Sequence, residues 1–109
     1  MIEETLRRIQ DQIERAALPS DKKRELETLL GDLKTEVAAL AQTDRDHAES
    51  IAQFAGLSAH EAMRPSGPVE LQRISLEGLA ATVDGFEATH PRLASIVNSL
   101  CVTLSNLGI

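Results

Sequence analysis

Aromatic residues and cysteines are scarce in this sequence. The 109 residues include no Trp or Tyr, two Phe (Phe54 and Phe86) and one cysteine, Cys101. A lone cysteine excludes an internal disulfide bond and the paired thiolates of common structural zinc sites. It also favours the reducing cytoplasm as the compartment of the protein.

Positive charge and long hydrophobic runs are scarce as well. The net charge of −6 argues against binding to nucleic acids and anionic membranes, both of which select basic surfaces. The most apolar stretch, residues 93–109, is interrupted by polar residues, and a membrane span needs about 20 predominantly apolar residues. The first residues, MIEETLRRIQ, have no apolar core of the kind that a signal peptide requires. We therefore expect a cytoplasmic protein with no membrane span and no nucleic-acid partner.

What the sequence does contain is a repeated spacing of apolar residues by three and four positions. The four series are Ile2, Leu6, Ile9 and Ile13; Leu26, Leu30, Leu33, Val37 and Leu40; Leu76, Leu79, Val83 and Phe86; and Leu93, Val97, Leu100, Leu104 and Leu107. This spacing places each series along one side of a helix. It predicts an all-α fold, an antiparallel helical bundle of about four main helices built from helical hairpins.

Prolines and glycines suggest where these helices end. We expect helices near residues 2–17, 21–41, 69–88 and 91–106, with one or two further helical pieces between 44 and 63. Ser58 and Glu61 have the spacing of a capping box in a short polar connector, and Gly108 is a candidate stop for the last helix. The chain is then one domain, residues 1–109, with an N-terminal hairpin (1–41), a variable connector (42–68) and a C-terminal hairpin (69–109).

Two carboxylate-x-x-His pairs raise the question of a metal site. The pairs are Asp44 with His47 and Glu87 with His90, and two-metal helical bundles use Glu-x-x-His pairs of this spacing. However, Pro91 disfavours a helix that continues through His90, so the segment EATHP is better interpreted as a helix junction. We expect no bound metal or other cofactor, and these four residues are the weak metal candidates if that expectation fails.

The motifs of common enzymes are missing. The sequence has no glycine-rich phosphate-binding loop, and Cys101 falls on the apolar side of its predicted helix, where burial keeps a thiol protonated and inert. We therefore expect that the protein is not an enzyme.

Charge is distributed very unevenly along the chain. Residues 1–50 carry 20 charged side chains and residues 51–109 carry 8, with none from Leu93 to Ile109. A helix without charge is either the buried central helix of the monomer or an interface, and both can be true. We predict a homodimer with Ser95, Asn98, Val102 and Ser105 at or near the contact. Ile96 is expected to remain exposed beside Val102.

Three segments together resemble a small bacterial family of unknown function: MIEETLRRIQ, FEATHPRL and LSNLGI. The resemblance covers most of residues 1–40 and 70–109, and it implies a compact all-α protein with no assigned activity. Our leading interpretation is a non-enzymatic, oligomeric interaction or scaffold protein, which leaves an unidentified protein partner open. The alternative is a helical bundle that binds metal through its carboxylate-x-x-His pairs.

Overall fold

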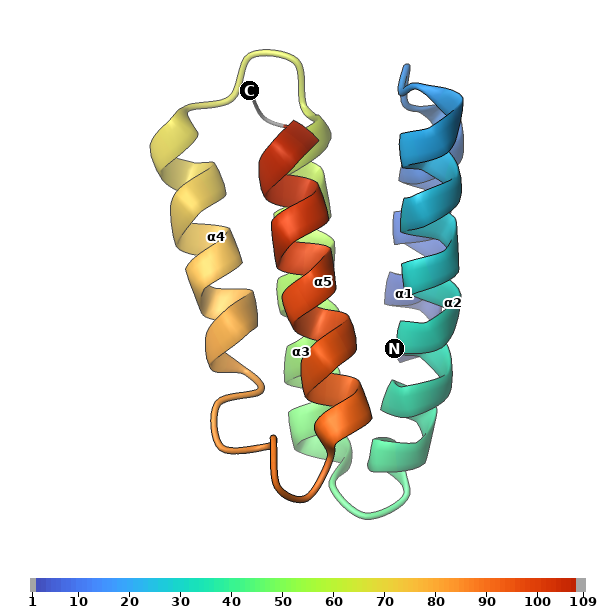
Figure 1. The fold of residues 1–109 in the computed structure, drawn as a ribbon, viewed down its shortest axis with the longest axis vertical. Coiled ribbons are helices and arrows are strands. Elements are labelled where there is room, and N and C mark those ends of the chain that lie inside the picture. The colour runs from blue at the N-terminus through green and yellow to red at the C-terminus, as the bar shows by residue number, and fades with distance from the viewer. Residues whose placement is uncertain (1, 108–109) are drawn as a thin grey trace.

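A computed structural model describes residues 2–107 and shows an all-helical bundle (Figure 1). The described residues form five helices: α1 (Ile2–Arg15), α2 (Ser20–Ala41), α3 (Arg45–Met63), α4 (Val69–Ala81) and α5 (Pro91–Leu107). Successive helices run in opposite directions, as the hairpin prediction requires. The expected number of about four main helices is too low, because residues 45–63, where one or two further helical pieces were expected, form one full helix of 19 residues.

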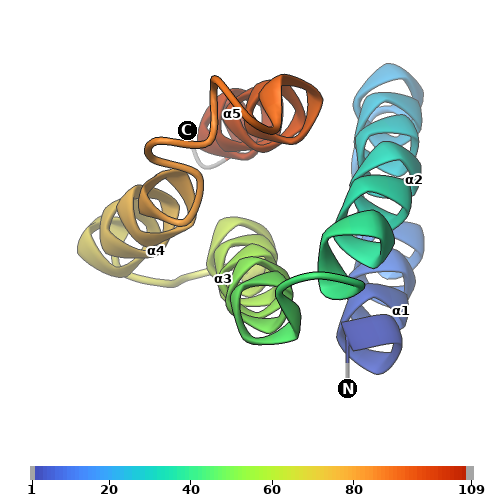
Figure 2. The same ribbon diagram turned by 90° about the horizontal axis from the view of Figure 1, so that it is seen from below.

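The helices lie in two layers. Figure 2 shows α1, α3 and α4 in one layer, with α2 and α5 in the other. Helix α3 contacts each of the other helices, whereas α4 contacts only α3 and α5. The central helix of the monomer is therefore α3. The absence of charge from the last helix had suggested α5 as the central helix, and that interpretation is wrong.

Small side chains explain the central position of α3. Its buried residues are mostly Ala and Ser: Ala48, Ile51, Ala52, Ala55, Ser58, Ala59 and Ala62. Side chains of this size let neighbouring helices approach closely on several sides. Ser58 lies in the middle of this helix and is fully buried, so the capping box predicted for Ser58 and Glu61 is wrong.

The apolar spacing of the other four helices correctly predicts the core. The first-helix series, from Ile2 to Ile13, is buried along its whole length, and the second-helix series is buried from Leu26 to Leu40. In α5 the predicted core residue Leu93 is buried. Ile96 is buried as well, with only 7% of its surface exposed. The expectation that Ile96 remains exposed is therefore wrong.

Helix α4 ends earlier than its apolar spacing suggests. The predicted range, 69–88, is therefore too long. The backbone N–H groups of Val83 and Asp84 donate to carbonyls three residues earlier, which is the pattern of a turn, and Gly85 then adopts a φ of 84°. That left-handed conformation strongly favours glycine. Val83 and Phe86 nevertheless contribute to the core from the turn.

The remaining helix ends agree with the predictions to within a few residues. The side chain of Asp44 accepts a hydrogen bond from the backbone N–H of His47 (3.1 Å) and so caps α3. Pro91 is the first residue of α5, as expected. The predicted stop at Gly108 lies outside the described residues. Across residues 2–107, every helix is too short or too polar to cross a membrane.

Candidate functional site

The outward side of α5 carries no charged side chain beyond its first turn. Because α5 packs on α2, α3 and α4, its buried residues point into the bundle, and one side remains in solvent between α2 and α4. We define this α5 face by its exposed residues, Ser95, Asn98, Ser99, Val102, Ser105 and Asn106. The four residues predicted from the sequence to lie at a contact, Ser95, Asn98, Val102 and Ser105, all belong to it.

Val102 is the most apolar residue of the α5 face. Its side chain is 62% exposed, although valine is among the residues that folded proteins most often bury. Its neighbours on the face are small or uncharged, so nothing there opposes contact with another protein surface through charge. The α5 face therefore presents an apolar side chain at the centre of a neutral surface.

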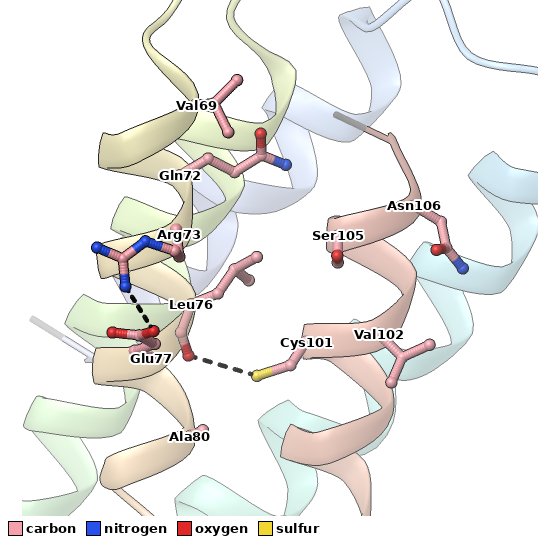
Figure 3. Close-up of a pocket in the computed structure, with 10 residues that line it drawn as sticks. All are labelled: Val69, Gln72, Arg73, Leu76, Glu77, Ala80, Cys101, Val102, Ser105 and Asn106. Carbon is pink, nitrogen blue, oxygen red and sulfur yellow. Dashed lines mark hydrogen bonds and ion pairs between the residues drawn. The ribbon is translucent and has the colours of Figure 1, made fainter. Parts of the chain in front are cut away.

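A groove between α4 and α5 borders this face on one side (Figure 3). It has a volume of about 740 Å³, and its apolar residues are Val69, Leu76, Ala80, Cys101 and Val102. The thiol of Cys101 points toward the backbone oxygen of Leu76, with Sγ 3.8 Å from that atom. Burial raises the pKa of this thiol, which keeps it protonated at neutral pH.

A second groove borders the α5 face on the side of α2. Its volume is about 610 Å³, and it is lined by α5, by Glu25 of α2 and by the turn before α5. The hydroxyl of Thr103 donates a hydrogen bond to Oε2 of Glu25 (3.1 Å), and this bond links α5 to α2 within the groove. Val102 lines both grooves and therefore forms the ridge that separates them.

The outer side of α4 is charged. Arg73 forms ion pairs with Glu70 and with Glu77, the latter at 2.7 Å between Nη1 and Oε2. The hydrogen bond and the positive charge of Arg73 lower the pKa of Glu70, and the two carboxylates raise the pKa of Arg73. All three side chains are more than half exposed to water, so these pairs contribute little to stability.

A second exposed apolar surface lies over α3 and α4. We call it the α3–α4 patch and define it by Phe54, Leu57, Leu71 and Ile74, all exposed. Phe54 lies directly over Gly78 of α4, where any larger side chain would overlap its ring. The sequence analysis missed this patch because it treated residues 42–68 as a connector, although Phe54 and Leu57 are spaced three residues apart on a helix.

The structure brings two of the four weak metal candidates together around an aromatic ring. The rings of His47 and His90 lie on Phe86, with centroid distances of 4.7 and 5.3 Å. Nε2 of His47 donates a hydrogen bond to the backbone oxygen of Thr82, and Asp44 is occupied as the cap of α3. Within residues 2–107 no group of three or more His, Cys, Asp or Glu side chains is placed to hold a metal ion.

The segment around Glu87 is a junction between helices, as its proline predicts. Residues 82–90 lie between α4 and α5, and the backbone N–H of His90 donates to the oxygen of Phe86 (2.7 Å). Glu87 is exposed and lines the groove on the α2 side, so it does not share a helix face with His90.

Comparison with known proteins gives a family without a function. Residues 26–109 match the model of a domain of unknown function, DUF4404. The match begins after α1 and includes all of α3. The resemblance noted from the sequence covered residues 1–40 and 70–109 and therefore left α3 out. No curated protein and no solved structure is significantly similar to the chain. The chain therefore belongs to the DUF4404 family of domains of unknown function.

Proposed function

We propose that this protein is a non-enzymatic interaction module that forms a homodimer through the α5 face. The observation that carries the proposal is the exposure of Val102 at the centre of a helix face with no charge. The chain has a net charge of −6, whereas the α5 face carries no charged side chain that would repel a second copy. We also place the protein in the cytoplasm, because a single half-buried cysteine suits a reducing compartment.

The two grooves supply the area that one helix face lacks. A stable interface buries about 800 Å² on each partner, and the grooves on both sides of α5 add surface to the α5 face. The groove beside α4 adds the apolar side chains of Leu76 and Ala80, and its outer end adds Val69, which is 75% exposed. A second copy that covers Val102 also covers parts of both grooves, because Val102 lines each of them.

A catalytic role has less support than an interaction role. The raised pKa of Cys101 opposes the thiolate that nucleophilic catalysis needs, and its Sγ faces a backbone carbonyl rather than a histidine. The metal-binding alternative also has less support, because Asp44 and His47 already bond to the backbone.

The mass of the protein in solution tests the proposal. Light scattering coupled to size exclusion should give twice the chain mass of 11.8 kDa for the wild type at tens of micromolar. Val102→Glu should shift the mass toward a single chain, because two carboxylates would then face each other in a dry contact. Ile74→Glu is the matched control, since Ile74 is similarly exposed (51%) but lies in the α3–α4 patch.

The variants also separate the two apolar surfaces. If Ile74→Glu dissociates the dimer and Val102→Glu does not, the interface lies over α3 and α4, and the proposal for the α5 face is wrong. Circular dichroism of both variants must show wild-type helical content, so that any loss of mass reports on association and not on unfolding.

A further inference from the structure

We infer that the two copies meet with their α5 helices antiparallel and with the two-fold axis beside Val102. This inference rests on the proposed dimer and adds its orientation and register. It starts from a stretch of α5 in which the order of residues is nearly the same in both directions.

Residues 98–106 have the sequence NSLCVTLSN, which is centred on Val102. Asparagine occupies both ends, serine the next position inward and leucine the position after that. Only Cys101 and Thr103, on either side of the centre, differ from each other. Burial follows the same symmetry: Leu100 and Leu104 are buried, and the exposed residues are Asn98, Ser99, Val102, Ser105 and Asn106.

This symmetry lies on the surface of the helix as well as in the sequence. Val102 is four residues after Asn98 and four before Asn106, and it is three residues from each serine. Residues three and four apart share one side of a helix, so the five exposed residues form one continuous stripe with Val102 at its middle. The stripe is the central part of the α5 face.

An antiparallel pair turns this order into matched contacts. When two copies are related by a two-fold axis beside Val102, each residue before Val102 faces a residue of the second copy that lies after Val102 on the same flank of the helix, which is the residue seven positions later. Asn98 then faces Ser105 of the second copy, and its amide can donate to the serine hydroxyl and accept from it. Ser99 faces Asn106 of the second copy in the same way, and the small side chains let the helices come close enough for the two Val102 side chains to touch.

Charge identifies a second copy as the occupant. Near a two-fold axis each residue lies beside the same residue of the second copy, so a charged side chain there is repelled by an identical charge. The α5 face has no charge, although 28 of the 109 residues are charged (11 Lys and Arg, 17 Asp and Glu). Arg73 and Glu77 of α4 line the α4–α5 groove beside this face, and their charges are paired with each other.

The antiparallel direction has two further advantages. It sets the N-terminal end of each α5 dipole toward the C-terminal end of the other, which is the favourable arrangement. It also keeps α4 of both copies on the same side of the axis, so that the apolar residues of the α4–α5 groove, drawn for one chain in Figure 3, lie near the contact in both copies.

Disulfide crosslinking measures the register. All chains carry Cys101→Ser, so that each has one introduced cysteine. Val102→Cys should crosslink to itself on mild oxidation. A mixture of Ser99→Cys and Asn106→Cys chains should crosslink to each other, whereas each of them alone should not. Two copies of position 99 would lie about 9 Å apart along the helix axis, which adds to the separation of the helices and exceeds the reach of a disulfide bond.

A second pair and a control complete the test. Asn98→Cys mixed with Ser105→Cys should behave as the first pair does, and Ile74→Cys should give no crosslinked product. Efficient crosslinking of Ser99→Cys to itself would overturn the proposed register, because that product requires parallel helices or an axis beside Ser99 instead of Val102. If the mass is that of a dimer in this case, the proposed function stands and the register fails. If the protein has the mass of one chain, both fail.

Discussion

Ser58 of α3 donates a hydrogen bond from its hydroxyl to the backbone oxygen of Ser75 in α4, at 3.0 Å and out of contact with water. This bond fixes α4, which contacts only α3 and α5, to the centre of the bundle. We predict that Ser58→Ala lowers the free energy of unfolding by about 1 kcal/mol, the usual net contribution of a buried hydrogen bond.

Ser50→Ala is the control for this variant. Ser50 lies on the exposed side of the same helix, so its replacement changes helix propensity without removing a buried bond. Urea denaturation of both variants gives the comparison. Equal stability of the two would contradict a structural role for the Ser58 hydroxyl.

Two glycines inside helices should respond oppositely to the same change. Gly31→Ala should raise the free energy of unfolding by about 0.5–1 kcal/mol, because alanine is the better helix former and a methyl group there meets no other atom within 4 Å. Gly78→Ala should lower it by about 1–3 kcal/mol, because the new methyl group overlaps the ring of Phe54. Thermal or urea unfolding measures both.

The double variant Phe54→Ala, Gly78→Ala checks the cause. Removal of the ring should make Gly78→Ala no longer destabilising in that background. If Gly78→Ala is as stabilising as Gly31→Ala in the wild-type background, the contact between Phe54 and Gly78 is not close.

The half-buried thiol gives a prediction about pH. Burial raises the pKa of Cys101 above its ordinary value of 9.0, so the unfolded chain loses this proton at lower pH than the folded one. The stabilising contribution is complete below pH 9.0 and is lost as the pH rises through the folded pKa. Relative to Cys101→Ala, the wild type should therefore lose stability as the pH rises above 9.0.

Alkylation of the same thiol is an independent check. Iodoacetamide should react more slowly with the folded protein at pH 8 than with the protein in urea, since the thiolate is the reacting species. Equal rates in the two states would contradict the raised pKa.

Metal analysis tests the alternative function. The purified protein should contain substoichiometric Fe, Mn and Zn, because the side chains of Asp44 and His47 already bond to backbone groups. His90→Ala should leave any metal content unchanged, and so should His60→Ala at the exposed His60. Stoichiometric metal that is lost in His47→Ala and His90→Ala but retained in His60→Ala would establish the metal-binding alternative.

Apolar spacing predicted four helices and most of the core, because Leu, Ile and Val mark a buried side clearly. It failed for α3, whose buried side is mostly alanine and serine and so resembles a polar connector. It also extended α4 too far, since Val83 and Phe86 continue the spacing while the chain turns at Gly85. Apolar spacing records which residues are buried, but not whether the backbone between them is helical.

The candidate site was only partly predictable for a related reason. The lack of charge after Arg92 identified the α5 face, because a buried or paired helix rarely carries charge. The two grooves could not be predicted, since they depend on where α4 and α2 lie beside α5. The symmetric order around Val102 is present in the sequence, but it has a structural meaning only once those residues are known to be exposed.

The contact between the two Val102 side chains is the most direct test of the account. An isotope-filtered NMR experiment on a mixture of labelled and unlabelled chains detects only contacts between different chains. We predict nuclear Overhauser effects from the labelled Val102 methyl groups to the Val102 methyl groups of the unlabelled chain. A dimeric sample in which such effects occur only at Phe54, Leu57 or Ile74 would contradict the account.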